Sequence, residues 1–167
     1  MRAAIAVVFF GLSAFAQADD MLDRLGLSED TLNDPLVKII FSEEKQVSEL
    51  KDIAVKLAEC NAIMEFSARI TSRSEEEYRN SAIKEQANLA SLAGYNVVDL
   101  AGYRPEMFDH LAKSRYRYWQ LQFDADPTND KSEVVGKMRY ASAACKETSA
   151  VQSVFAAFAN ELKYRKD

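Results

Sequence analysis

Residues 42–70 read SEEKQVSELKDIAVKLAECNAIMEFSARI and carry the clearest helical pattern in the chain. Side chains recur there at alternating spacings of three and four residues, which is typical of a helix that packs against other helices along one face. The positions on this face are Val47, Leu50, Ala54, Leu57, Asn61, Met64 and Ala68. Cys60 falls at the edge of the same face, so we expect its side chain to be buried.

The last long stretch, residues 130–162, repeats this alternation and carries Cys145, the second of the two cysteines. Between these stretches, residues 74–100 begin with a capping box from Ser74 to Glu77 and present a face of small residues that includes Gly94. A further helix follows Arg104-Pro105. Its apolar side chains fall on two flanks, which predicts deep burial; they are Phe108, Ala112, Trp119 and Phe123 on one, and Met107, Leu111, Tyr118 and Leu121 on the other.

Four long helices with short connections favour an all-α fold, an up-down-up-down four-helix bundle over residues 42–167. Residues 19–41 are expected to form a short helical N-terminal arm, in which Asp34-Pro35 begins a helix PLVKIIF. Ser42 is expected to cap the first long helix.

An up-down-up-down order makes the first and fourth helices neighbours and places their cysteines at comparable heights. We therefore predict one disulfide between helices, from Cys60 to Cys145. The alternative is a pair of buried free thiols.

The beginning of the chain has the composition of a secretory signal peptide. Arg2 precedes an uncharged apolar run over residues 3–15, and Ala-Gln-Ala follows at 16–18. We expect cleavage after Ala18, which would leave a periplasmic or secreted, soluble protein with no membrane span. A retained membrane anchor is the alternative, although the run is short for a bilayer.

The overall composition excludes several function classes. An excess of Asp and Glu, 26 against 21 Lys and Arg, argues against nucleic acid as a partner. With His110 as the single histidine and no catalytic or phosphate-binding motif, we expect no enzyme activity, no metal site and no cofactor. A haem bundle is the alternative, with His110 and Met64, Met107 or Met138 as axial ligands.

The segment Lys113-Ser-Arg-Tyr-Arg-Tyr-Trp119 is basic and aromatic within an acidic chain. Arginine and aromatic side chains are enriched at interface hot spots, so we treat these residues as a candidate binding surface for an anionic group or the acidic face of a partner. They are Lys113, Arg115, Tyr116, Arg117, Tyr118 and Trp119. The alternative is that Tyr118 and Trp119 serve helix packing and the arginines form ordinary surface ion pairs.

Polar side chains also fall on the otherwise apolar faces of the first and last helices. They are Asn61, Thr148 and Gln152, which we name the polar seam. Such residues commonly fix the register of neighbouring helices; the alternative is a small polar pocket between the two helices.

Together these features predict an exported helical bundle that acts by binding and not by catalysis. A protein partner is the first expectation, and inhibitors and immunity-type proteins are examples of this class. The alternative is a carrier that holds a small molecule or a cofactor, such as haem or a metal, in the bundle interior. The sequence does not predict the oligomeric state.

Overall fold

The computed structural model of this chain describes residues 25–127 and 131–164. Every regular element in these ranges is a helix, which confirms the predicted all-α class. The helices are α2 (Glu29–Leu32), α3 (Pro35–Phe41), α4 (Val47–Thr71), α5 (Glu75–Asn80), α6 (Ala82–Leu100), α7 (Glu106–Ala125), α8 (Ser132–Ala141), α9 (Ala143–Glu147) and α10 (Ser149–Tyr164). The predicted signal peptide, residues 1–18, and residues 19–24 of the predicted arm lie outside the described residues.

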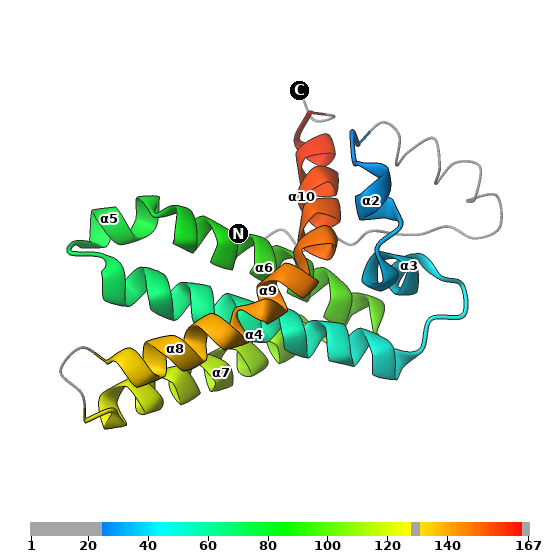
Figure 1. The fold of residues 1–167 in the computed structure, drawn as a ribbon. Coiled ribbons are helices and arrows are strands. Elements are labelled where there is room, and N and C mark those ends of the chain that lie inside the picture. The colour runs from blue at the N-terminus through cyan, green and yellow to red at the C-terminus, as the bar shows by residue number, and fades with distance from the viewer. Residues whose placement is uncertain (1–24, 128–130, 165–167) are drawn as a thin grey trace.

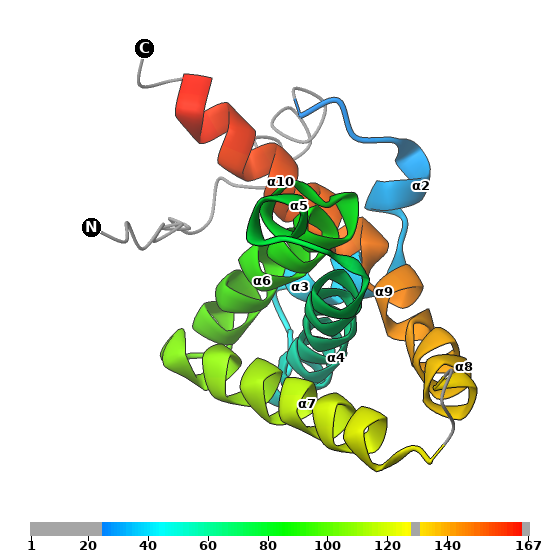
Figure 2. The same ribbon diagram turned by 90° about the vertical axis from the view of Figure 1, so that its left-hand side faces the viewer.

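Helix α4 is the central element of the fold. Figure 2 shows α4 with α6 and α7 on one side and α8 and α9 on the other, and α4 contacts all of these helices. Its side chains Leu50, Ala54 and Leu57 are almost completely buried. The periodicity of residues 42–70 therefore identified part of the face around which the other helices assemble. Val47, which was predicted on this face, is 47 % exposed, and Ile63 and Phe66, which were not, are buried.

Small residues let α6 and its neighbours approach closely. Ala87, Ala90 and Ala93 are fully buried, and Gly94 lies directly against the Phe108 ring of α7. A Cβ atom added at Gly94 would lie 2.0 Å from Phe108 Cε2. The absence of a side chain at this position is therefore what makes room for the ring.

The N-terminal helix α3 begins as its sequence predicts. The Asp34 carboxylate accepts hydrogen bonds from the backbone N–H groups of Leu36 at 2.9 Å and Val37 at 3.3 Å, so it satisfies donors that have no partner within the helix. Val37 is buried in the core, and the ring of Phe41 lies 6.1 Å from that of Phe158 on α10.

The predicted cap of the first long helix is wrong. Ser42 ends α3, and its hydroxyl accepts a hydrogen bond from the backbone N–H of Glu44 at 3.2 Å. Helix α4 begins only at Val47, where the Glu49 carboxylate accepts from the backbone N–H of Gln46 at 3.3 Å. The serine is used in the turn between the two helices and is not available to cap the second.

The predicted helix over residues 74–100 is interrupted near its beginning. The Ser74 hydroxyl accepts from the Glu77 N–H at 3.1 Å as expected, but the Ser81 hydroxyl accepts from the Lys84 N–H at 3.2 Å. Ser81 has extended backbone angles, so it ends α5 and caps α6. A second serine that binds the backbone thus divides one predicted helix into two.

The predicted fourth helix, residues 130–162, is likewise not continuous. At its two breaks, the Ser142 hydroxyl donates to the Arg139 carbonyl at 2.6 Å and the Thr148 hydroxyl donates to the Ala144 carbonyl at 2.8 Å. Hydroxyl groups that bond back to earlier carbonyls bend helices. In Figure 1 the chain accordingly turns from α8 through the short α9 into α10, which points away from the direction of α8.

These breaks change the architecture. After α9 the chain leaves the course of a fourth bundle helix, and α10 packs against α6 and contacts α2 and α3. The up-down-up-down four-helix bundle is therefore not confirmed. Over the described residues, the fold is a helical assembly around α4, in which the last segment is bent across the others.

Candidate functional site

The predicted cysteine pair lies at bonding distance. The sulfur atoms of Cys60 and Cys145 are 2.13 Å apart and their Cα atoms 4.7 Å apart. Cys60 is buried in the middle of α4, whereas Cys145 lies in α9 and is partly exposed. The bond therefore attaches the bent C-terminal segment to the central helix.

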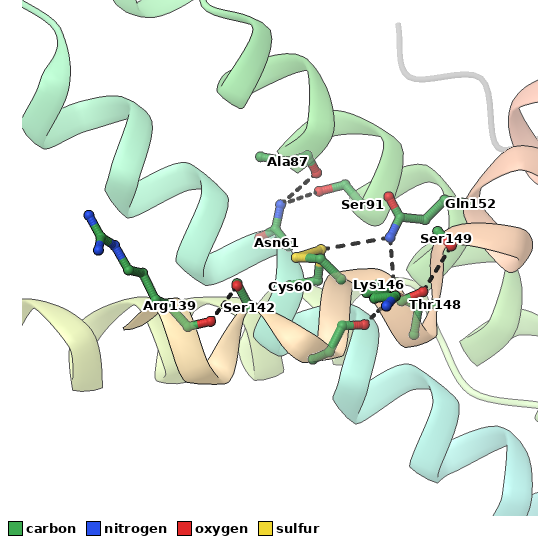
Figure 3. The surroundings of a disulfide bond; sticks show 12 residues. Cys60, Asn61, Ala87, Ser91, Arg139, Ser142, Lys146, Thr148, Ser149 and Gln152 are labelled. Carbon is green, nitrogen blue, oxygen red and sulfur yellow. Dashed lines mark hydrogen bonds between the residues drawn. A yellow bond between two sulfur atoms is a disulfide. The ribbon is translucent and has the colours of Figure 1, made fainter. Parts of the chain in front are cut away.

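Two residues of the polar seam lie beside this disulfide (Figure 3). The Gln152 side-chain amide donates to the Thr148 hydroxyl at 3.0 Å and to the Cys60 sulfur at 3.7 Å. Both side chains are buried, with Thr148 fully inaccessible to solvent. Because their donors have partners inside the protein, this pair completes the attachment of α10 to α4.

The third residue of the polar seam, Asn61, points elsewhere. Figure 3 shows its amide directed toward α6, where it donates to the Ala87 carbonyl and the Ser91 hydroxyl, both at 2.8 Å. The structure therefore does not bring the three residues into one polar group. Asn61 links α4 to α6, whereas Gln152 links α10 to Cys60 of α4 and is itself bonded to Thr148.

Half of the predicted basic and aromatic segment serves helix packing. Trp119 is buried, and its indole N–H donates to the Glu59 carboxylate of α4 at 2.8 Å. The same carboxylate forms an ion pair with Arg115 at 3.3 Å. The Tyr116 ring packs edge-on against Phe66, with ring centroids 5.5 Å apart, and burial raises the pKa of its phenol.

The other three residues of that segment face solvent. Lys113 and Arg117 are exposed and have no ion-pair partner among the described residues. The Tyr118 ring is 47 % exposed. Helix packing and a binding surface were the two alternatives for this segment, and they apply to different residues. One flank of α7 packs against α4, and the other stays open.

Deep burial was predicted for both flanks of α7. It holds for Phe108, Ala112 and Trp119 of the first flank but is wrong for the second. Leu121 is 56 % exposed, although it lies on the same predicted apolar flank as Tyr118. On α8, Tyr140 is 87 % exposed. The sequence did signal Tyr140, because this aromatic residue falls outside the apolar alternation of residues 130–162.

Helices α7 and α8 contact each other, and both carry exposed side chains. The Glu133 carboxylate, which accepts a hydrogen bond from Lys137 at 2.6 Å, raises the pKa of Lys137, and the nearby Tyr118 of α7 acts in the same direction. Tyr140 lies one turn farther along α8 than Lys137. We name this region the α7–α8 surface, made of Lys113, Arg117, Tyr118, Leu121 and Tyr140.

The residues considered as haem ligands differ in solvent exposure. His110 is exposed, Met64 and Met107 are partly buried, and Met138 is buried beside Trp119. Within residues 25–127 and 131–164, no group of three or more His, Cys, Asp or Glu side chains is placed to hold a metal ion. In the same part of the chain, no helix is both long and apolar enough to cross a membrane.

Comparisons with protein-family models, with curated proteins and with solved structures gave no match to this chain.

Proposed function

We propose that this protein is exported and acts without catalysis, by binding the acidic face of a partner protein through the α7–α8 surface. The observation that carries this proposal is the exposure of three large side chains on the same two helices as two cations that have no ion-pair partner in the described part of the chain. Tyr118, Leu121 and Tyr140 supply the apolar area, and Lys113 and Arg117 supply the charge.

The chemistry of these side chains supports recognition of a protein. Tyrosine buries a large rigid surface on binding and loses little conformational entropy. A cation that is not already neutralised within its own chain can pair with a carboxylate across an interface, which speeds association and selects against basic partners. Lys113 and Arg117 meet this condition, whereas Arg115 is already paired with Glu59.

Export is supported by the composition of residues 1–18 and by the Cys60–Cys145 pair, since disulfides persist mainly in oxidising compartments. Intact mass of the protein expressed with its own leader tests this part. We expect a chain that begins at Asp19 and whose thiols react with an alkylating reagent only after reduction. An unprocessed chain with freely reactive thiols would contradict export.

The binding proposal is tested by affinity capture from the exported fraction of the native host, followed by titration with the purified partner. The test variants are Arg117→Glu and Tyr118→Ala. Arg73→Glu is the matched control, since Arg73 is also exposed but lies in the turn after α4. The wild type and the control should retain one stoichiometric partner, and each test variant should weaken binding by at least about tenfold.

All of these side chains are exposed, so the variants should melt like the wild type. Equal capture of the same proteins by every variant would show that binding does not use the α7–α8 surface. Failure to capture any stoichiometric partner from that fraction would also contradict the proposal.

A further inference from the structure

Helix α3 carries apolar side chains on more than one side, and its half-buried Leu36 and Ile39 pack at the edge of the core. Its sequence is PLVKIIF, and Val37 and Ile40 point into the core, where they are 3 % and 2 % exposed. Leu36 and Ile39 lie on another side of the helix and are only half-buried. This second pair of aliphatic side chains contributes to an open surface.

Leu36 and Ile39 line a hollow of about 400 Å³ between α3 and the first half of α4. Figure 1 shows α3 beside the end at which α4 begins. From α4, the buried side chain of Ile53 and the exposed side chain of Val55 complete the apolar lining. We name this feature the α3–α4 hollow.

The charged groups around the α3–α4 hollow are acidic in sum. Its lining includes Glu49, Asp52 and Lys56. Lys56 is already neutralised by Glu147 of α9, at 2.7 Å. Neither Asp52 nor Glu49 has an ion-pair partner among the described residues, although the Glu49 carboxylate accepts a hydrogen bond from the backbone N–H of Gln46. Both carboxylates can therefore meet a basic side chain of a partner.

We infer that the α3–α4 hollow is a docking site for a basic amphipathic helix of a partner protein. An amphipathic helix places apolar side chains three and four residues apart into a groove, and its flanking charges contact the rim. Leucine-like anchors would contact Leu36, Ile39 and Val55 while lysine or arginine approaches Glu49 and Asp52. The acidic rim repels a helix of the same shape with carboxylates on its flanks.

This site is separate from the α7–α8 surface and has the opposite charge. The α7–α8 surface offers the cations Lys113 and Arg117, whereas the α3–α4 hollow offers the carboxylates Glu49 and Asp52. The chain thus presents one surface suited to an acidic partner and one suited to a basic partner. The inference does not depend on the proposed function.

The test titrates the isolated full chain with two synthetic amphipathic helices. One peptide contains only leucine and lysine, and the other has glutamate at every lysine position. Calorimetry gives the affinity, and backbone NMR shifts give the location. We expect the leucine–lysine peptide to bind, to weaken as salt is raised, and to shift signals of α3 and the first half of α4.

Charge variants distinguish binding in the α3–α4 hollow from nonspecific attraction of a basic peptide to an acidic protein. Asp52→Lys should lower the affinity for the leucine–lysine peptide by at least about tenfold. Glu85→Lys makes the same change of charge on an exposed position near the start of α6, and should leave the affinity within about twofold. Ile39→Ser removes an apolar anchor and should also weaken binding.

Asp52 is exposed, so its variant tests the site even if Ile39→Ser lowers stability. The inference is overturned if neither peptide binds, if both bind equally, or if the shifts fall outside α3 and α4. Equal loss of affinity in Asp52→Lys and Glu85→Lys would also overturn it, because the attraction would then come from net charge alone.

Discussion

Helix α6 and the α8–α10 segment both pack against the centre of the molecule, but they are attached by different means. Helix α6 is continuous over 19 residues and approaches its neighbours through alanine and glycine. The α8–α10 segment is broken twice, and its middle piece, α9, buries no side chain. Besides the apolar side chains that α8 and α10 bury, the disulfide at Cys145 and the polar contacts of Thr148 and Gln152 hold the segment in place.

Helix α6 and the α8–α10 segment thus show two ways to attach a helical segment to the centre of the molecule. Small side chains allow close contact between helices without any covalent bond, and they leave the helix straight. A segment whose hydroxyl groups bond back to its own carbonyls bends. Helices α8 and α10 still bury apolar side chains in the core, among them Met138, Val151 and Phe155, but α9 between them buries none. The covalent bond to α4 attaches this middle piece, which apolar burial does not hold.

Removal of the disulfide should affect the C-terminal segment most strongly. The bond closes a loop between residues 85 positions apart, so the chain-entropy model gives a loss of about 4 to 5 kcal/mol in the double variant Cys60→Ala, Cys145→Ala. Chemical denaturation of the oxidised wild type and the variant measures this difference in the free energy of unfolding. Reductant should destabilise the wild type and leave the variant unchanged. A loss below about 1 kcal/mol would mean that noncovalent contacts alone hold the segment.

The next effect contrasts two glycines, one in each region. Gly94→Ala places a methyl group against the Phe108 ring, and we expect it to destabilise the protein by about 1 to 3 kcal/mol. Gly136→Ala on α8 meets no atom within 4 Å and should stabilise by about 0.5 to 1 kcal/mol, because alanine is the better helix former. Thermal and chemical unfolding of both variants check the signs.

Phe108→Leu should lessen the loss caused by Gly94→Ala, because the smaller side chain frees the position of the methyl group. If both glycine variants stabilise the protein, the contact between α6 and α7 is looser than its geometry implies.

A smaller effect tests the polar attachment of α10. Thr148→Val keeps the shape of the side chain but removes the acceptor for the buried amide of Gln152, which should cost about 1 to 2 kcal/mol. Ser149→Ala is the matched control, since its exposed hydroxyl also bonds back to a carbonyl, and its effect should stay within about 0.5 kcal/mol. Equal effects of the two variants on urea unfolding would show that burial of the hydroxyl does not matter.

The part of the fold that was predictable depends on local patterns. The buried face of α4 follows from periodicity, the start of α3 follows from Asp34-Pro35, and the cysteine pairing follows from two helices expected to be neighbours. The breaks at Ser81, Ser142 and Thr148 were missed because a hydroxyl side chain within a helical pattern is compatible with both a straight helix and a cap. Tertiary contacts decide between these outcomes.

The candidate site was only half predictable for a related reason. Composition drew attention to residues 113–119, but it could not separate Trp119, which reaches Glu59, from Tyr118, which faces solvent. The exposure of Leu121 and Tyr140 depends on how α8 lies relative to α7. Long-range geometry of this kind is not encoded in a local window of sequence.

The smallest expected effect concerns an exposed ion pair on the regular side of the molecule. The hydrogen bond from Arg69, at 2.7 Å, lowers the pKa of Glu75 below its ordinary value of 4.5. Near that value, the folded protein therefore binds fewer protons at Glu75 than the unfolded chain does. The pair contributes stability above about pH 4.5, and this contribution is lost as the pH falls through the lowered pKa of the folded state.

Glu75→Gln should consequently make the free energy of unfolding fall less steeply between about pH 5 and pH 3, with a difference that shrinks in high salt. Urea unfolding at a series of pH values measures the slope. Glu44→Gln removes the same charge from an exposed position between α3 and α4 and should keep the wild-type slope. If Glu75→Gln also keeps that slope, the Arg69–Glu75 ion pair between α4 and α5 adds nothing to the free energy of unfolding. Close contact through small side chains would then stabilise this region without it.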